Sequence, residues 1–120
     1  YLTRPFVLSW SMIESMSAGC LVIGSDTPPV REVIQDGKNG LLADYFSPKQ
    51  IADRVDEVFS HPTRMAHIRQ QARQTVLDYY SHERLLPKHI QLMRNVAARQ
   101  FPPDTHLADV TVPSPLFANR

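Results

Sequence analysis

Apolar residues in the first half of the chain form short runs that alternate with turn-forming residues. The apolar run 21–23 ends at a Gly-Ser-Asp turn, which predicts a short strand buried on both faces, as in a parallel sheet. The run 41–43 predicts a second strand, after a turn at 36–40 that contains two glycines and an asparagine. Before the first strand, residues 11–18 predict a short helix that ends at Gly19.

Two adjacent prolines interrupt the connection between the two strands. Because a proline biases the residue before it away from the α region, we expect Thr27-Pro28-Pro29 to be extended. One or two helical turns over 30–34 would follow. At the start of the chain, 1–3 is a candidate for a third, very short strand.

Apolar residues in the second half recur at helical spacing and predict three helices. The first begins at Ser47, with Pro48 in its first turn, and ends at His61-Pro62. The second covers 63–80, and the third begins at Ser81 with a kink or restart expected at Pro87. The predicted apolar faces are Ile51, Ala52, Val55, Val58 and Phe59; then Met65, Ile68, Ala72, Val76 and Tyr79; then Leu86, Ile90, Met93 and Ala97. Strands that alternate with helices predict an α/β fold with a partial doubly wound, Rossmann-like parallel sheet and C-terminal helices.

Composition changes once, near the end of the chain. Four of the ten prolines lie in 101–120, which shows neither helical nor strand periodicity, so we expect an extended or disordered tail there and a structured part over 1–100. Two or three strands are few for a parallel sheet that stands alone. We therefore expect the chain to be part of a larger domain.

The charge and residue content exclude several classes of function. A formal net charge of +1 gives no basic patch for nucleic acid, and the arginines at 64, 69 and 73 alternate with glutamines, which favours a solvated helix face. One cysteine excludes an intramolecular disulfide, and no Cys-x-x-Cys or paired histidine motif indicates zinc. The glycine-rich phosphate loops and the nucleophile elbow are also absent from the sequence.

The remaining candidate is the segment 5–14, in which a strand stub leads through a loop to a helix N-terminus. Unpaired N–H groups and the positive end of the helix dipole favour phosphate at such a place. Glu14 would accept hydrogen bonds from sugar hydroxyls. A structural alternative is that Ser11 and Glu14 form a capping box, which the pattern alone favours. Trp10 has a similar alternative as an apolar anchor at the helix start.

From Pro5 to Ala43 the sequence resembles the C-terminal domain of the group 1 (family 4) retaining glycosyltransferases, which have the two-domain GT-B fold. That family carries E-G-F-G-L-P-x-x-E, then A-x-x-x-G-x-P-V-I-x-S, T-G-G-x-x-E-[VI]-[VI] and D-G-x-N-G-x-L. The second glutamate of the first block falls on Glu14, and the later blocks match 17–25, 26–34 and 36–42. The resemblance implies the C-terminal part of a GT-B donor domain.

The resemblance also implies roles for residues. Glu14 would bind the ribose hydroxyls of a nucleotide-diphosphate sugar, and the backbone around Leu8, Ser9 and Trp10 would face the diphosphate. Phe6 stands where the family has a glutamate that contacts the donor sugar, and Pro28-Pro29 stands in place of Gly-Gly. A phenylalanine side chain accepts no hydrogen bond. This departure indicates another way of holding the sugar, a different donor or a decayed site.

The function implied is transfer of a sugar, of hexosyltransferase type, from a nucleotide-diphosphate donor to an acceptor hydroxyl with retention. The resemblance implies no cofactor or metal and a cytoplasmic enzyme whose acceptor-binding N-terminal domain, and any membrane contact, lie outside this chain. We expect the chain alone to be inactive and expect no nucleic-acid partner. The alternative is a degenerate, non-catalytic α/β module that mediates protein contacts, which the phenylalanine at position 6 favours.

Overall fold

A computed structural model describes residues 1–4 and 8–98; Phe6 and the predicted tail 101–120 lie outside these residues. Strand β1 (Ile23–Ser25) pairs in parallel with β2 (Leu41–Ala43), with Ile23 opposite Leu41. On the other side of β1, the Tyr1 nitrogen donates to the Ile23 carbonyl at 2.8 Å and the Ser25 N–H donates to the Tyr1 carbonyl at 3.1 Å. This is the slanted pattern of a parallel pair, so the predicted stub at 1–3 lies beside β1.

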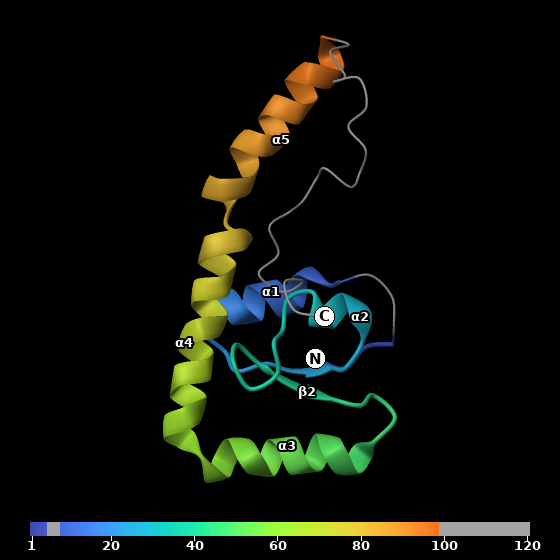
Figure 1. Cartoon of the computed structure of the whole chain (residues 1–120), viewed down its shortest axis with the longest axis vertical. Coiled ribbons are helices and arrows are strands. Elements are labelled where there is room, and N and C mark those ends of the chain that lie inside the picture. The colour runs from blue at the N-terminus through green and yellow to red at the C-terminus, as the bar shows by residue number, and fades with distance from the viewer. Residues whose placement is uncertain (5–7, 99–120) are drawn as a thin grey trace.

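Helices cover both faces of these extended segments. They are α1 (Trp10–Ser17), α2 (Pro28–Arg31), α3 (Pro48–Ser60), α4 (Pro62–Tyr79) and α5 (His82–Ala97). Figure 1 shows α1 and α2 on one side of the strands and α3 on the other, with α4 along one end and α5 extending away from the body. Helices on both faces of a parallel sheet confirm the predicted α/β, doubly wound class. Among the described residues, no helix is both long and apolar enough to cross a bilayer.

The first predicted strand is displaced by two residues. We expected 21–23, but the paired residues are 23–25, because the Gly-Ser that seemed to end the strand is part of it. A Cβ on Gly24 would lie 2.8 Å from Val30 Cγ1, which is closer than real Cβ contacts. A glycine therefore suits this position of the strand, because α2, which carries Val30, packs too closely for a larger residue.

The two prolines are helical, contrary to expectation. Thr27 is extended, with φ −126° and ψ 153°, but Pro28 and Pro29 are the first two residues of α2. A proline is tolerated there because its missing N–H would have no partner within the helix. The helix also ends earlier than expected, at Arg31.

The other predicted elements are confirmed with small changes. Strand β2 covers the expected residues, and Gly37 in the preceding turn has φ +73°. The Ser47 side chain accepts a hydrogen bond from the Gln50 N–H at 3.3 Å and caps α3. Helix α5 continues through Pro87 without a restart.

The core consists of two clusters, one on each side of the strands. The first lies under α1 and α2, and the second lies against α3. Helix α4 contributes to both: Ala72 and Val76 belong to the first cluster, and Met65 and Ile68 to the second. By contrast, neither α3 nor α5 contains a buried residue, so the apolar faces predicted for these two helices are largely exposed.

Candidate functional site

The candidate site is the N-terminal end of α1, at the carboxyl edge of the strands. Figure 1 shows this edge on the side of the body away from α4. The N-cap residue is Ser9, whose Oγ accepts from the Ser11 N–H at 3.3 Å and lies 2.8 Å from Ser11 Oγ. The Ser9 N–H donates to the Tyr1 hydroxyl at 3.1 Å, which ties this end of the helix to the first extended segment. Among the described residues, the Trp10 N–H has no hydrogen-bond partner outside the helix.

Glu14 lies on the exposed face of α1, opposite the buried Met12 and Met16. Its carboxylate makes no hydrogen bond or ion pair with any residue that the structure describes. The capping-box alternative is therefore wrong, because the cap is Ser9 and Glu14 is the fifth residue of the helix, beyond the reach of the capping position. The helix itself does not use this carboxylate.

Of the other predicted site residues, Leu8 and Trp10 differ in environment. Leu8 is half-buried, and its side chain packs against the first core cluster. Trp10 is 78% exposed and does not anchor the helix, which overturns the structural alternative for its side chain. The structure thus brings Leu8, Ser9, Trp10 and Glu14 to one helix end; Phe6 lies outside the described residues.

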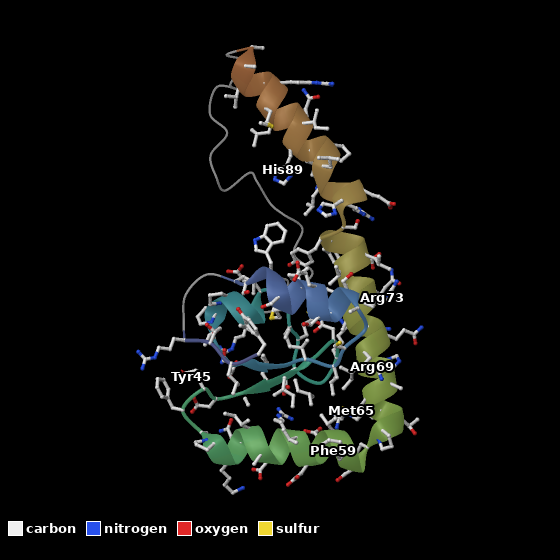
Figure 2. The ribbon with its side chains drawn as sticks, turned by 180° about the vertical axis from the view of Figure 1, so that it is seen from behind. Tyr45, Phe59, Met65, Arg69, Arg73 and His89 are labelled. Atoms are coloured by element: carbon white, nitrogen blue, oxygen red, sulfur yellow. The ribbon has the colours of Figure 1, made fainter. Side chains whose placement is uncertain are left out.

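The opposite end of α1 is held by two arginines of α4. Arg69 Nε donates to the Gly19 carbonyl at 2.7 Å, and Arg73 donates to the Ser17 carbonyl at 2.9 Å. Figure 2 shows both arginines on α4, above Met65. Cations are favoured at a helix C-terminus, where carbonyls lack partners. Both arginines are exposed, as expected for a solvated helix face, and their bonds to the end of α1 are an additional role that was not predicted.

An ion pair lies at the carboxyl end of β1. Arg31 of α2 forms a bidentate pair with Asp26, through Nε to Oδ1 and Nη2 to Oδ2. The hydrogen bonds from Arg31 hold the pKa of Asp26 below its usual range. The adjacent Thr27 hydroxyl is buried and has no hydrogen-bond partner among the described residues. The Asp26–Arg31 pair was not predicted from the sequence, because a helix that was not expected to begin at Pro28 brings the two residues together.

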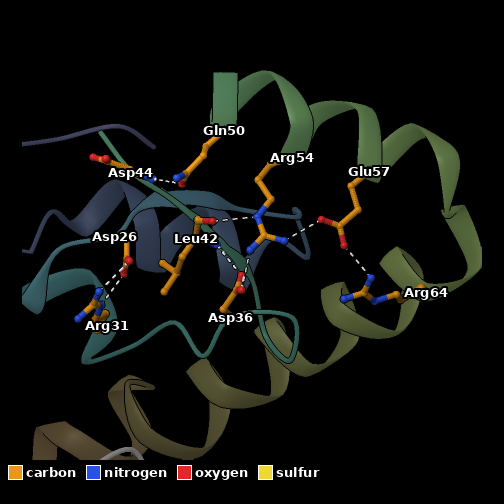
Figure 3. A network of polar contacts seen from close by, with 9 residues as sticks. All are labelled: Asp26, Arg31, Asp36, Leu42, Asp44, Gln50, Arg54, Glu57 and Arg64. Carbon is orange, nitrogen blue, oxygen red and sulfur yellow. Dashed lines mark hydrogen bonds and ion pairs between the residues drawn. The ribbon is translucent and has the colours of Figure 1, made fainter. Parts of the chain in front are cut away.

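The largest polar network lies at α3 and joins it to the strands (Figure 3). Arg54 donates to the Leu42 carbonyl at 2.9 Å, to Asp36 at 2.6 Å and to Glu57 at 2.7 Å, and Arg64 of α4 donates to Glu57 at 2.6 Å. The hydrogen bond from Arg54 is the main cause of a lowered Glu57 pKa. The network borders a surface hollow of about 260 Å³ lined by Gln50, Asp53, Arg54 and Glu57. All four side chains already bond to other groups of the protein, so we assign this hollow a structural role.

Across residues 1–4 and 8–98, the structure contains no group of three or more His, Cys, Asp or Glu side chains placed to hold a metal ion.

Comparison with solved structures identifies the fold. The chain superposes on Anabaena Alr3699/HepE in complex with UDP with a TM-score of 0.69 and 17% identity, over 80% of this chain and 26% of that one. It also matches the C-terminal domain of a glycosyl transferase group 1 family protein (LpcC) from Francisella tularensis, with a TM-score of 0.61 and 28% identity, over 66% of this chain and 40% of that chain. The fold is therefore that of part of a GT-B glycosyltransferase.

Sequence comparison then gives the family. The profile of the family "Glycosyl transferases group 1" matches residues 7–75, which is more than half of the chain, so the chain belongs to this family. Spore coat protein SA of Bacillus subtilis (strain 168) is 42% identical over 48 residues, which are 39% of this chain and 13% of that protein. The chain thus spans only a small part of the length of its relatives.

Proposed function

We propose that this chain supplies the nucleotide-binding edge of an enzyme that transfers a sugar from a nucleotide-diphosphate donor to an acceptor hydroxyl. Membership of the glycosyl transferases group 1 family supports a transferase. The proposal assigns Glu14 to the ribose and the start of α1 to the diphosphate. The acceptor site and the remaining donor contacts would lie in parts of the protein outside this chain.

The observation that carries the proposal is the Glu14 carboxylate, which bonds to no residue that the structure describes. An ionised carboxylate is an acceptor only, and its two oxygens suit two neighbouring hydroxyls such as those of a ribose. Glu14 lies four residues after Trp10, or about 6 Å along the helix axis. That separation suits a ribose beside Glu14 and a phosphate at the N-terminus of the same helix.

The N-terminus of α1 offers what a diphosphate needs. The Trp10 N–H has no intrahelical partner, and the hydroxyls of Ser9 and Ser11 lie 2.8 Å apart at the same end. Anions are favoured there by the helix dipole. The UDP complex of the structurally similar Anabaena protein supports a nucleoside diphosphate as the ligand class.

The finer expectations follow from the family resemblance and stay predictions. They are retention at the anomeric carbon, a hexosyl donor, chemistry without a metal, a cytoplasmic location and inactivity of this chain without the acceptor-binding domain.

Calorimetric titration of the full-length protein with UDP, GDP and ADP tests the proposal. We expect one nucleotide to bind, and Glu14→Gln to weaken that binding at least tenfold while leaving the thermal unfolding temperature unchanged, because Glu14 is exposed and bonds to no described residue. Glu83→Gln is the matched control, since Glu83 is an exposed glutamate on α5.

Failure of a folded wild-type protein to bind any of the three nucleotides would overturn the proposal and favour the non-catalytic alternative. Equal binding by wild type and Glu14→Gln would remove Glu14 from the site.

A further inference from the structure

The exposed face of α1 carries a large aromatic ring beside the Glu14 carboxylate. Trp10 and Glu14 are four residues apart, so their side chains are neighbours on one face of the helix. Trp10 is 78% exposed, although an indole is usually well buried. Because the opposite face of α1 is filled by Met12 and Met16, packing within the described residues does not account for a tryptophan at this position.

We propose that the Trp10 indole stacks against the ring of the donor sugar and contributes to sugar selection; this inference rests on the proposed function. Trp10 is the first residue of α1 and lies about 6 Å nearer the N-terminus than Glu14, and side chains on a helix lean toward its N-terminus. Along a nucleotide sugar the order is base, ribose, diphosphate and sugar. With the ribose at Glu14 and the diphosphate at the helix start, the next group in the direction of the indole is the sugar.

The chemistry of the two partners is complementary. The C–H face of a pyranose is apolar, and an exposed indole gains by covering its ring while its N–H stays free to donate a hydrogen bond. The sequence has phenylalanine, which accepts no hydrogen bond, at position 6. A site that holds its sugar partly by ring stacking has less need of a carboxylate there.

Paired titrations of the full-length protein test this inference. The probes are UDP-glucose, UDP-galactose, UDP-N-acetylglucosamine, GDP-mannose and ADP-glucose, and the sugar nucleotide that wild type binds best is compared with its own nucleoside diphosphate. We expect Trp10→Ala to weaken the sugar nucleotide about three- to tenfold, as for one aromatic stacking contact, and to change the diphosphate less than twofold. Trp10→Phe retains a ring and should recover most of the lost affinity.

Phe59→Leu is the control, because Phe59 is an equally exposed aromatic residue at the far end of α3. Unchanged binding of both ligands by Trp10→Ala overturns the inference, and so does an equal loss for both, because an equal loss places the indole on the nucleotide. Either result leaves the proposed function standing if wild type binds the diphosphate and Glu14→Gln does not. Absence of any nucleotide binding by wild type overturns the proposed function itself.

Discussion

Replacement of Arg54 by alanine should destabilise the protein more than removal of any other single surface charge in the network of Figure 3. The side chain is 28% exposed and bonds at once to the Leu42 carbonyl, to Asp36 and to Glu57. Because α3 has no buried residue, this polar attachment holds the helix to β2 where apolar burial is weak.

The magnitude follows from the three contacts. A hydrogen bond from a charged donor contributes about 1.5–3 kcal/mol, and each partly exposed ion pair about 0.2–1 kcal/mol. The sum is roughly 2–5 kcal/mol. Glu57 keeps Arg64 as a partner and Asp36 is 43% exposed, so we expect the lower part of that range, about 2–3 kcal/mol.

Urea unfolding with linear extrapolation measures this loss, and an unchanged slope with urea shows that stability alone has changed. Arg54→Lys should lie between wild type and Arg54→Ala, because lysine keeps the charge but cannot bond to three partners through a planar fork. Lys49→Ala is the matched control on the same helix, because it removes a single ion pair, to Asp53. The Lys49 and Asp53 side chains are 85% and 58% exposed, so the free energy of unfolding should not change measurably. If Arg54→Ala behaved like Lys49→Ala, the network would not be what attaches α3.

Two further predictions concern packing and pH. Gly24→Ala should lower the free energy of unfolding by about 1–3 kcal/mol in thermal or urea unfolding, because the added Cβ would lie 2.8 Å from Val30 Cγ1; wild-type stability in this variant would show that α2 moves freely. Hydrogen bonds from Arg54 lower the folded-state pKa of Glu57, so its contribution is present above the ordinary glutamate pKa of about 4.3 and is lost as pH falls through the lower folded value. The free energy of unfolding, measured between about pH 3 and 7, should therefore fall more steeply toward acid pH for wild type than for Glu57→Gln. Parallel curves of this free energy against pH would contradict the prediction.

Sequence patterns predicted the elements whose signals are local. The cap at Ser47, the glycine turn before β2 and the buried stripe of α4 each depend on residues a few positions apart. The displaced start of β1 and the helical prolines depend instead on what packs against them, which a single sequence does not display. Gly24, for example, is a residue type typical of turns, yet it lies within β1, where Val30 leaves little room for a larger side chain.

The candidate site shows the same division. The sequence placed Glu14 on the first helix, but its pattern favoured a capping box of Ser11 and Glu14, whereas the N-cap in the structure is Ser9. The exposure of Trp10 was not predictable, since an indole at a helix start is equally consistent with a buried anchor. The arginine bonds to the end of α1 join residues 50 and 56 positions apart and had only a weak periodic signal.

The contribution of α4 to both core clusters affects how the protein unfolds. Its first half closes the core against α3, and its second half closes the core under α1, so one continuous helix serves both layers. Separation of either layer exposes apolar surface along the same helix and loosens its hold on the other layer. The two layers should therefore behave as one cooperative folding unit, in which the amides around Ile68 and Ala72 exchange with solvent only when the whole body unfolds.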